Sequence, residues 1–155
     1  MSESTRRLVD IARSHGLELE ISTFPSGTKT ADDAAAAIGC DVAAIVKSLV
    51  FTVDDEPVVA LVPGDRRLDP DALARVAGGQ VVARAHLDTV REATGYVAGG
   101  TPPFGHVREL RVFADELLRR HDPVWAAGGT PATVFPISVA DLDRVARPIW
   151  ADIST

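Results

Sequence analysis

The chain has very little cysteine, because Cys40 is the only one among its 155 residues. An intramolecular disulfide is therefore impossible, and a structural metal site built on cysteine thiolates has no second ligand of that kind. The sequence also lacks any apolar run approaching the ~18 residues of a membrane span, and its start lacks the apolar segment of a secretion signal. We therefore expect a cytoplasmic protein without a membrane partner.

Positive charge is also scarce. Lysine and arginine number 16 against 22 aspartates and glutamates, which gives a formal net charge of −6. Proteins that bind nucleic acid along its length gain affinity by neutralising several phosphates, so this balance argues against DNA as a partner and against broad binding of RNA. It leaves room for an enzyme that contacts only the end of an RNA through a local basic surface.

The common catalytic and metal-binding motifs are missing. HExxH, GxSxG, CxxC and the phosphate-binding GxxxxGK[ST] are all absent. The histidines lack the spacing of metal ligands and are better explained as surface or capping residues; they are His15, His86, His106 and His121. We expect neither a metal nor a cofactor.

The composition, with 46% hydrophobic and 25% charged residues, is that of an ordinary globular protein, and the length fits one domain spanning residues 1–155. Segments with the period of a helix alternate with short runs that have the period of a strand. The expected helices cover residues 4–15, 31–38, 41–46, 70–77, 86–93, 115–121 and 139–146. The expected strands cover residues 17–23, 48–53, 57–63, 80–85, 107–115, 123–129 and 132–138. This pattern predicts an α+β fold, with a mixed, mostly antiparallel sheet flanked by helices.

Lys47 is the first of two candidate functional features. It stands at the expected junction between a short apolar helix and the apolar strand that follows. Taken alone, it is best explained as a cation that complements the helix dipole and extends its ammonium into water. The alternative is a fixed cation at the edge of the sheet, facing a cleft and an anionic or polarised ligand.

The second feature is the segment TGYVAGGTPPFGH, from Thr94 to His106, which we call the glycine loop. Glycines let a backbone approach a ligand and leave amide N–H groups accessible, while prolines stiffen the loop so that these donors keep their direction. Such a loop can stabilise a developing oxyanion. A rigid connector is the alternative interpretation, and in either case we expect the loop to be exposed.

Together, the two features resemble a known family. AAAAIGCDVAAIVKSLVF is followed by TGYVAGGTPPFG and then by WAAGG before the last helix, and this order, from about Leu8 to Ile149, resembles the YbaK/EbsC family and the related editing insertion of bacterial prolyl-tRNA synthetases. Members hydrolyse the ester that joins an amino acid to the terminal ribose of transfer RNA, typically a small residue misattached to a proline-accepting tRNA. The resemblance therefore implies an aminoacyl-tRNA deacylase whose partners are the acceptor end of tRNA and, as a second candidate, prolyl-tRNA synthetase.

The resemblance also implies a site. It carries Lys47 over as the functional lysine and places the family's GxxxP loop on residues 99–103. The implied catalytic residues are Lys47, Gly99 and Gly100. The implied substrate-binding residues are Phe24, Ser48, Thr101, Pro103, Gly128 and Gly129.

An aminoacyl ester is already activated, so the implied mechanism needs no strong protein nucleophile. We expect amides around Gly99 and Gly100 to orient the ester carbonyl and stabilise developing negative charge while water attacks. Lys47 would anchor either the terminal nucleotide or the carbonyl. Relatives that remove cysteine tend to have a serine and an acidic residue where this chain has Ala127 and Val134, which argues against specificity for Cys-tRNA.

Two alternative functions stay open at the level of sequence. One is a noncatalytic module of the same fold that binds tRNA or a synthetase, and it would bind without ester hydrolysis. The other is a hydrolase that uses the same cleft on a simpler ester or amide, and tRNA acceptor-stem fragments would not compete with its substrate.

Overall fold

Short local signals set the ends of the helices in the computed structural model, which describes residues 1–28 and 30–155. The Thr30 hydroxyl accepts a hydrogen bond from the Asp33 amide at the start of one helix, and the Ser138 hydroxyl accepts one from the Asp141 amide at the start of another. The α-helices are α1 (Glu3–Ser14), α2 (Ala31–Ile38), α3 (Pro70–Ala77), α4 (Leu87–Thr94) and α5 (Val139–Ala146). The 3-10 helices are η1 (Val42–Ala44) and η2 (Glu116–Arg120). Within the described residues, none of the helices has the length and apolar character needed to cross a membrane.

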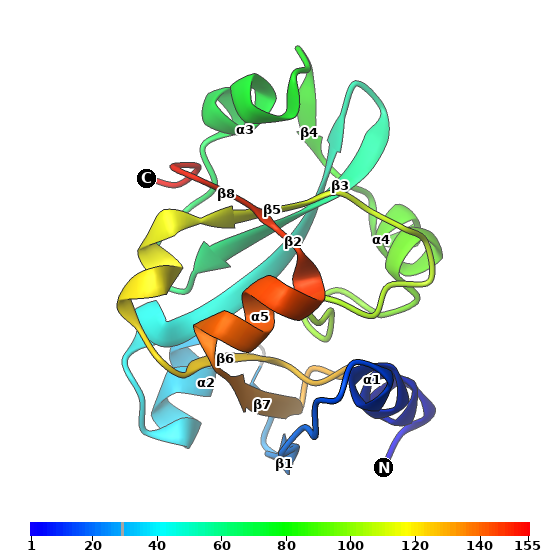
Figure 1. The fold of residues 1–155 in the computed structure, drawn as a ribbon, viewed down its shortest axis with the longest axis vertical. Helices are drawn as coiled ribbons and strands as arrows, with labels where there is room; N and C mark the ends of the chain where they lie inside the picture. The colour runs from blue at the N-terminus through cyan, green and yellow to red at the C-terminus, as the bar shows by residue number, and fades with distance from the viewer. Residues whose placement is uncertain (29) are drawn as a thin grey trace.

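One mixed sheet of eight strands runs through the molecule (Figure 1). The strands are β1 (Ser22–Thr23), β2 (Ile45–Val53), β3 (Glu56–Pro63), β4 (Val82–Arg84), β5 (Val112–Asp115), β6 (Val124–Ala127), β7 (Thr133–Ile137) and β8 (Ile149–Ala151). Their order is β1-β7-β6-β2-β3-β5-β8, with β4 paired to β2 beside this path. Among the described strands, four pairings are antiparallel and three are parallel. The predicted α+β fold with a mixed sheet flanked by helices is confirmed.

Different helices cover the two faces of the sheet. Leu8 of α1 and Leu142 of α5 belong to the same buried cluster as Val46 of β2, and Figure 1 shows α5 in front of the sheet on this side. On the opposite face, Leu73 of α3 packs in a second buried cluster. α2 packs in a third cluster, which contains Ile45. Because Ile45 and Val46 are successive residues of β2, their side chains leave opposite faces of the sheet.

Several boundaries predicted from the sequence are wrong. Residues 17–23 alternate as a strand should, and three apolar side chains of that segment do pack on the core, but only β1 at its end finds a partner strand, β7. The helix expected at residues 41–46 is the single turn η1, because β2 already begins at Ile45. Lys47 therefore lies inside β2, not at a helix-to-strand junction. Residues 107–111 are not part of β5, the helix at 115–121 is the 3-10 helix η2, and β8 was not predicted.

Candidate functional site

The middle of β2 has a free edge. β6 pairs with Ile45 and Val46, and β4 pairs with residues 51–53 on the same side of the strand. Between these two partners, residues 47–50 have no neighbouring strand on that side within the described part of the chain. The Val50 carbonyl accepts a hydrogen bond from Ala85 on this edge. Since alternate residues of a strand direct their backbone groups the same way, the N–H and C=O of Ser48 face the gap.

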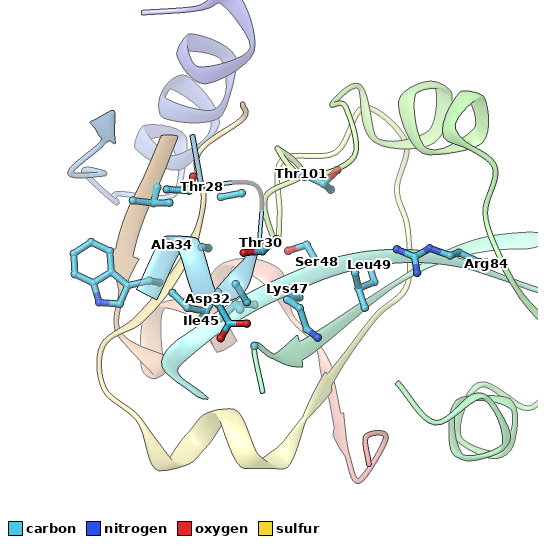
Figure 2. A pocket seen from close by; sticks show the side chains of 18 residues that line it. Thr28, Thr30, Asp32, Ala34, Ile45, Lys47, Ser48, Leu49, Arg84 and Thr101 are labelled. Carbon is cyan, nitrogen blue, oxygen red and sulfur yellow. The ribbon is translucent and has the colours of Figure 1, made fainter. Parts of the chain in front are cut away.

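A cavity of about 410 Å³ occupies this gap (Figure 2). That volume lies in the range of small-molecule sites, roughly 300 to 1,000 Å³. Four of the residues implied by the family resemblance line it: Lys47, Ser48, Gly99 and Thr101. The remaining lining residues are Thr28, Thr30, Ala31, Asp32, Ala34, Ile45, Val46, Leu49, Gly64, Arg84, Trp125, Ala126, Ala127 and Val134. β2, the start of α2, the glycine loop and the β6–β7 hairpin thus meet around one space.

Lys47 and Ser48 lie on opposite faces of β2. Figure 2 shows the Ser48 side chain on the side of the strand where Thr101 lies, and the Lys47 side chain on the other side. Both line the same cavity because the cavity extends around the free edge of the strand. A ligand in it can therefore contact the glycine loop on one face and a fixed cation on the other.

The Lys47 ammonium is held by a backbone carbonyl. Its Nζ donates a hydrogen bond to the Arg66 carbonyl oxygen, and the Arg66 side chain is in turn bonded to Ser154, with Nε 3.1 Å from the hydroxyl and Nη2 2.9 Å from the carbonyl. Burial lowers the pKa of Lys47 below its ordinary value, and the Asp65 carboxylate opposes this shift. Arg67 and Arg84 lower the pKa of Lys47 further. The Asp32 carboxylate raises it, so Lys47 lies in a partly desolvated cluster of charges of both signs.

The Ser48 hydroxyl has no hydrogen-bond partner among the described residues, although its oxygen is buried. A buried hydroxyl without a partner costs about 1 to 3 kcal/mol relative to a satisfied one. Such an atom at the border of a cavity is available to a ligand that brings its own donor or acceptor, once the side chain rotates about its single χ1 bond.

The glycine loop contributes two kinds of glycine to this region. Gly99 is exposed and has a φ of +85°, whereas Gly100 is buried. A β-carbon on Gly100 would lie 2.7 Å from the Thr130 Cα, so the loop packs backbone to backbone against the β6–β7 hairpin. The expectation of an exposed loop is therefore wrong at Gly100, and also at Thr101, which is 3% exposed.

The amides of the glycine loop differ in whether a hydrogen-bond acceptor within the protein already occupies them. The Gly100 N–H donates to the Val97 carbonyl at 3.0 Å and is thus occupied inside the loop. The Thr101 hydroxyl also donates to Val97, at 3.1 Å. For the amides of Gly99 and Thr101, no acceptor is found in the described part of the chain. Of the loop residues without such an acceptor, Gly99 and Thr101 are the two that line the cavity.

The other residues implied by the resemblance are not among the described residues that line the cavity. The Phe24 amide donates to the Ala132 carbonyl at 2.8 Å, and Pro103 is buried in the glycine loop. Gly128 accepts a hydrogen bond from the Thr5 hydroxyl at 2.7 Å, and a β-carbon on Gly129 would approach the backbone of α1 to 3.1 Å. The structure therefore places both hairpin glycines against α1, and their role toward substrate stays a prediction.

Among the lining residues that were not identified from the sequence are Asp32, Gly64 and Arg84. Gly64 follows β3, and a β-carbon there would lie 2.4 Å from the Val42 carbonyl oxygen, so the chain requires glycine at this close approach. The dipeptide Pro63–Gly64 at the end of a predicted strand was a usable signal for a residue near Lys47. In a hairpin of the two predicted strands it lies opposite the start of β2, and the structure pairs Pro63 with Val46. Asp32 and Arg84 had no such signal, because their proximity depends on how α2 and β4 meet β2.

Comparison with known proteins identifies the family. A sequence model described as the aminoacyl-tRNA editing domain matches residues 25–145. The chain belongs to this family. The match includes β2 with Lys47 and the whole glycine loop, so the predicted resemblance to YbaK/EbsC is confirmed.

Individual relatives agree with this assignment. The editing domain is 42% identical over 103 residues to a proline–tRNA ligase of Maridesulfovibrio salexigens, which is 66% of this chain but 17% of that enzyme. It is 27% identical over 128 residues to EbsC of Enterococcus faecalis, named as a candidate Cys-tRNA(Pro)/Cys-tRNA(Cys) deacylase, which covers 81% of this chain and 77% of that one. A crystal structure described as a candidate trans-editing enzyme for prolyl tRNA synthetase superposes with a TM-score of 0.94 at 38% identity, covering 100% and 99% of the two chains. The chain thus spans a small part of the ligase it matches and nearly all of this solved relative.

Proposed function

We propose that this editing domain acts in trans as an aminoacyl-tRNA deacylase, which hydrolyses the ester of a small amino acid misattached to a proline-accepting tRNA. One observation carries the proposal: Lys47 lines a single cavity at the free edge of β2 together with Gly99 and Thr101, whose amides have no acceptor among the described residues. The names of the ligase and deacylase relatives support the choice of ester and of tRNA.

The ester carbonyl binds on the face of β2 that carries Ser48. There the amides of Gly99 and Thr101 are free to donate to the carbonyl oxygen and to the oxyanion that forms when water attacks, which is the arrangement that lowers the barrier most for acyl transfer. Gly100 contributes differently, because its amide is occupied and its lack of a side chain lets the loop lie on Thr130. The Ser48 hydroxyl and backbone amide supply further polar contacts.

The terminal nucleotide binds around the edge, on the face that carries Lys47. The opposite orientation of Lys47 and Ser48 favours the nucleotide rather than the carbonyl as the partner of the ammonium. Arg84 lines the same cavity and lies near enough to lower the pKa of Lys47, so the two cations together attract a phosphate. The Asp32 carboxylate, also in the lining, acts on Lys47 in the opposite sense to Arg84 and so helps to keep the ammonium charged.

The lining also bears on which amino acid is removed. Ala127 and Val134, at positions where cysteine-removing relatives tend to have serine and an acidic residue, both border the cavity. An apolar surface there favours a small apolar side chain over one with a thiol or hydroxyl. Differences of one methylene are worth only about 1 to 3 kcal/mol in such a pocket.

The test is a panel of mischarged tRNAs, scored for loss of the acylated form with and without prolyl-tRNA synthetase. We expect the chain to deacylate proline-accepting tRNA that carries a small amino acid, and Lys47→Ala to lower kcat/KM by at least tenfold. The control is Arg120→Ala, which removes one exposed cation of η2 away from the described lining. Binding of the tRNA without loss of the ester would instead identify a noncatalytic module, and undiminished turnover by Lys47→Ala would remove Lys47 from the mechanism.

A further inference from the structure

Helix α1 lies outside the segment that the editing-domain family model matches, residues 25–145, yet it touches both loops near the cavity. Its buried residues include Thr5 and Leu8, and Arg7 between them is half-buried. The family assignment gives α1 no role. Its contacts with the glycine loop and with the β6–β7 hairpin give it one.

Arg7 joins the two ends of the glycine loop. Its Nη2 donates to the Gly95 carbonyl at 2.9 Å, and its guanidinium carbon lies 4.6 Å from the centroid of the Tyr96 ring. The Tyr96 hydroxyl in turn donates to the Gly105 carbonyl at 3.1 Å. One planar cation therefore reaches the first turn of the loop directly and its last turn through Tyr96, with Gly99 and Thr101 between them.

The second loop rests on the same helix. The Thr5 hydroxyl donates to the Gly128 carbonyl at 2.7 Å, and it is buried. The following turn holds Thr130, on which the Gly100 backbone packs. Three contacts thus hold the glycine loop around Gly99 and Thr101. Two come from α1, through Arg7 directly and through Thr5 by way of the hairpin, and the third is the packing of Gly100 on Thr130.

Stability alone does not explain an arginine at this position. Its Nε is buried without a hydrogen-bond partner among the described residues. Leaving this donor unsatisfied costs free energy that offsets part of what the hydrogen bond to Gly95 contributes to stability. What an apolar residue cannot do is hold the Gly95 carbonyl and the Tyr96 ring in one fixed relation, since this requires the planar, multi-donor guanidinium.

We propose that Arg7 is a positioning residue for ester hydrolysis: through Gly95 and Tyr96 it fixes the glycine loop so that the Gly99 and Thr101 amides point at the reacting carbonyl. The inference rests on the proposed deacylase function and deepens it. Arg7 contacts no substrate in this arrangement. Its effect should therefore fall on kcat and leave KM for the mischarged tRNA unchanged.

The experiment compares Arg7→Met, Arg7→Lys and the control Arg13→Met in the full chain. Arg13 is an exposed cation of the same helix that pairs with Glu18, so the control removes an equal charge from α1. We expect Arg7→Met to lower kcat at least tenfold, with KM within twofold of wild type, and Arg7→Lys to recover only part of the loss. Arg13→Met should leave both constants unchanged.

Hydrogen exchange gives a readout that does not depend on activity. The amides of Gly100 and Val107 are hydrogen-bonded within the segment that Arg7 holds, to Val97 and Thr94. Arg7→Met should speed their exchange at least tenfold while the amides of β3 stay protected. A structural role spread over the whole fold would speed exchange in β3 as well.

Unchanged kcat in Arg7→Met, or unchanged exchange of the Gly100 and Val107 amides, would overturn the inference while leaving the deacylase intact. If Arg7→Met does not fold, Arg7→Lys decides, and wild-type kcat and exchange in that variant overturn the inference. Absence of deacylation by the wild-type chain would instead overturn the proposed function, and with it the catalytic role of Arg7.

Discussion

Gly100→Ala tests the packing of the glycine loop by adding a single methyl group. The added β-carbon would lie 2.7 Å from the Thr130 Cα and 2.8 Å from its carbonyl carbon. Carbon atoms prefer separations of about 3.5 to 4.0 Å, so the loop or the hairpin must move by close to 1 Å. Overpacking of this size costs about 1 to 3 kcal/mol. For a chain of 155 residues that corresponds to a melting temperature lowered by roughly 2 to 12 °C.

The same displacement should reach the chemistry. Gly99 and Thr101, which flank Gly100, carry the amides proposed to bind the oxyanion, and a misplacement of 1 Å can cost up to about 100-fold in rate. The assay is deacylation of a mischarged tRNA under saturating conditions, well below the melting temperature of each variant. We expect kcat of Gly100→Ala to fall by about tenfold to a hundredfold, since the displacement is close to 1 Å.

Gly99→Ala is the comparison variant for stability alone, since the Gly99 amide itself is proposed to bind the oxyanion. A β-carbon there would find its nearest neighbour, a side-chain carbon of Pro131, at 3.9 Å, so no atom has to move. Its cost comes only from the φ of +85°, about 1 to 2 kcal/mol for a residue other than glycine. Should Gly100→Ala keep the wild-type melting temperature and kcat, the close contact with Thr130 would not be what positions the loop.

Three other changes test separate parts of the site. Because burial lowers the pKa of Lys47, the charge needed to hold a phosphate should be lost at a pH below the ordinary 10.5. Lys47→Arg should therefore move the alkaline loss of activity to higher pH. Identical pH–rate profiles of the two proteins, corrected for spontaneous ester hydrolysis, would argue against a charged Lys47. Ser48→Ala removes a buried hydroxyl that has no partner among the described residues, so the variant should unfold at the same or a higher temperature than the wild type while its kcat/KM falls. A lower melting temperature would show that the hydroxyl is satisfied in the free protein. Burial lowers the pKa of His106 below 6.5, so just under that pH the unfolded chain binds more protons than the folded chain, and the free energy of unfolding should fall as the pH decreases. In urea titrations, His106→Gln should show a smaller fall than the wild type. An equal fall in both proteins would exclude His106 as its source.

The sequence alone determined the parts of this protein that depend on local interactions. Hydroxyl caps at Thr30 and Ser138 and left-handed glycines such as Gly39 mark helix ends within a few residues of the groups they satisfy. The acidic turn between β2 and β3 predicted their hairpin for the same reason. The spacing of Lys47 and the glycine loop was sufficient to recognise the family.

Only the tertiary structure decided how the site is assembled. The free edge of β2 exists because its pairing with β6 ends at Val46 and its pairing with β4 begins only at Phe51, and pairings between strands far apart in the chain leave no local signal. The same pairings place Lys47 and Ser48 on either side of one cavity and bury Gly100 against Thr130. Arg7 could not be found from its neighbours in the sequence, since its role comes from Gly95 and Tyr96, which are brought to it by the packing of α1. Long-range contacts depend on the energy of the whole fold, and that is why the sequence could not predict this arrangement.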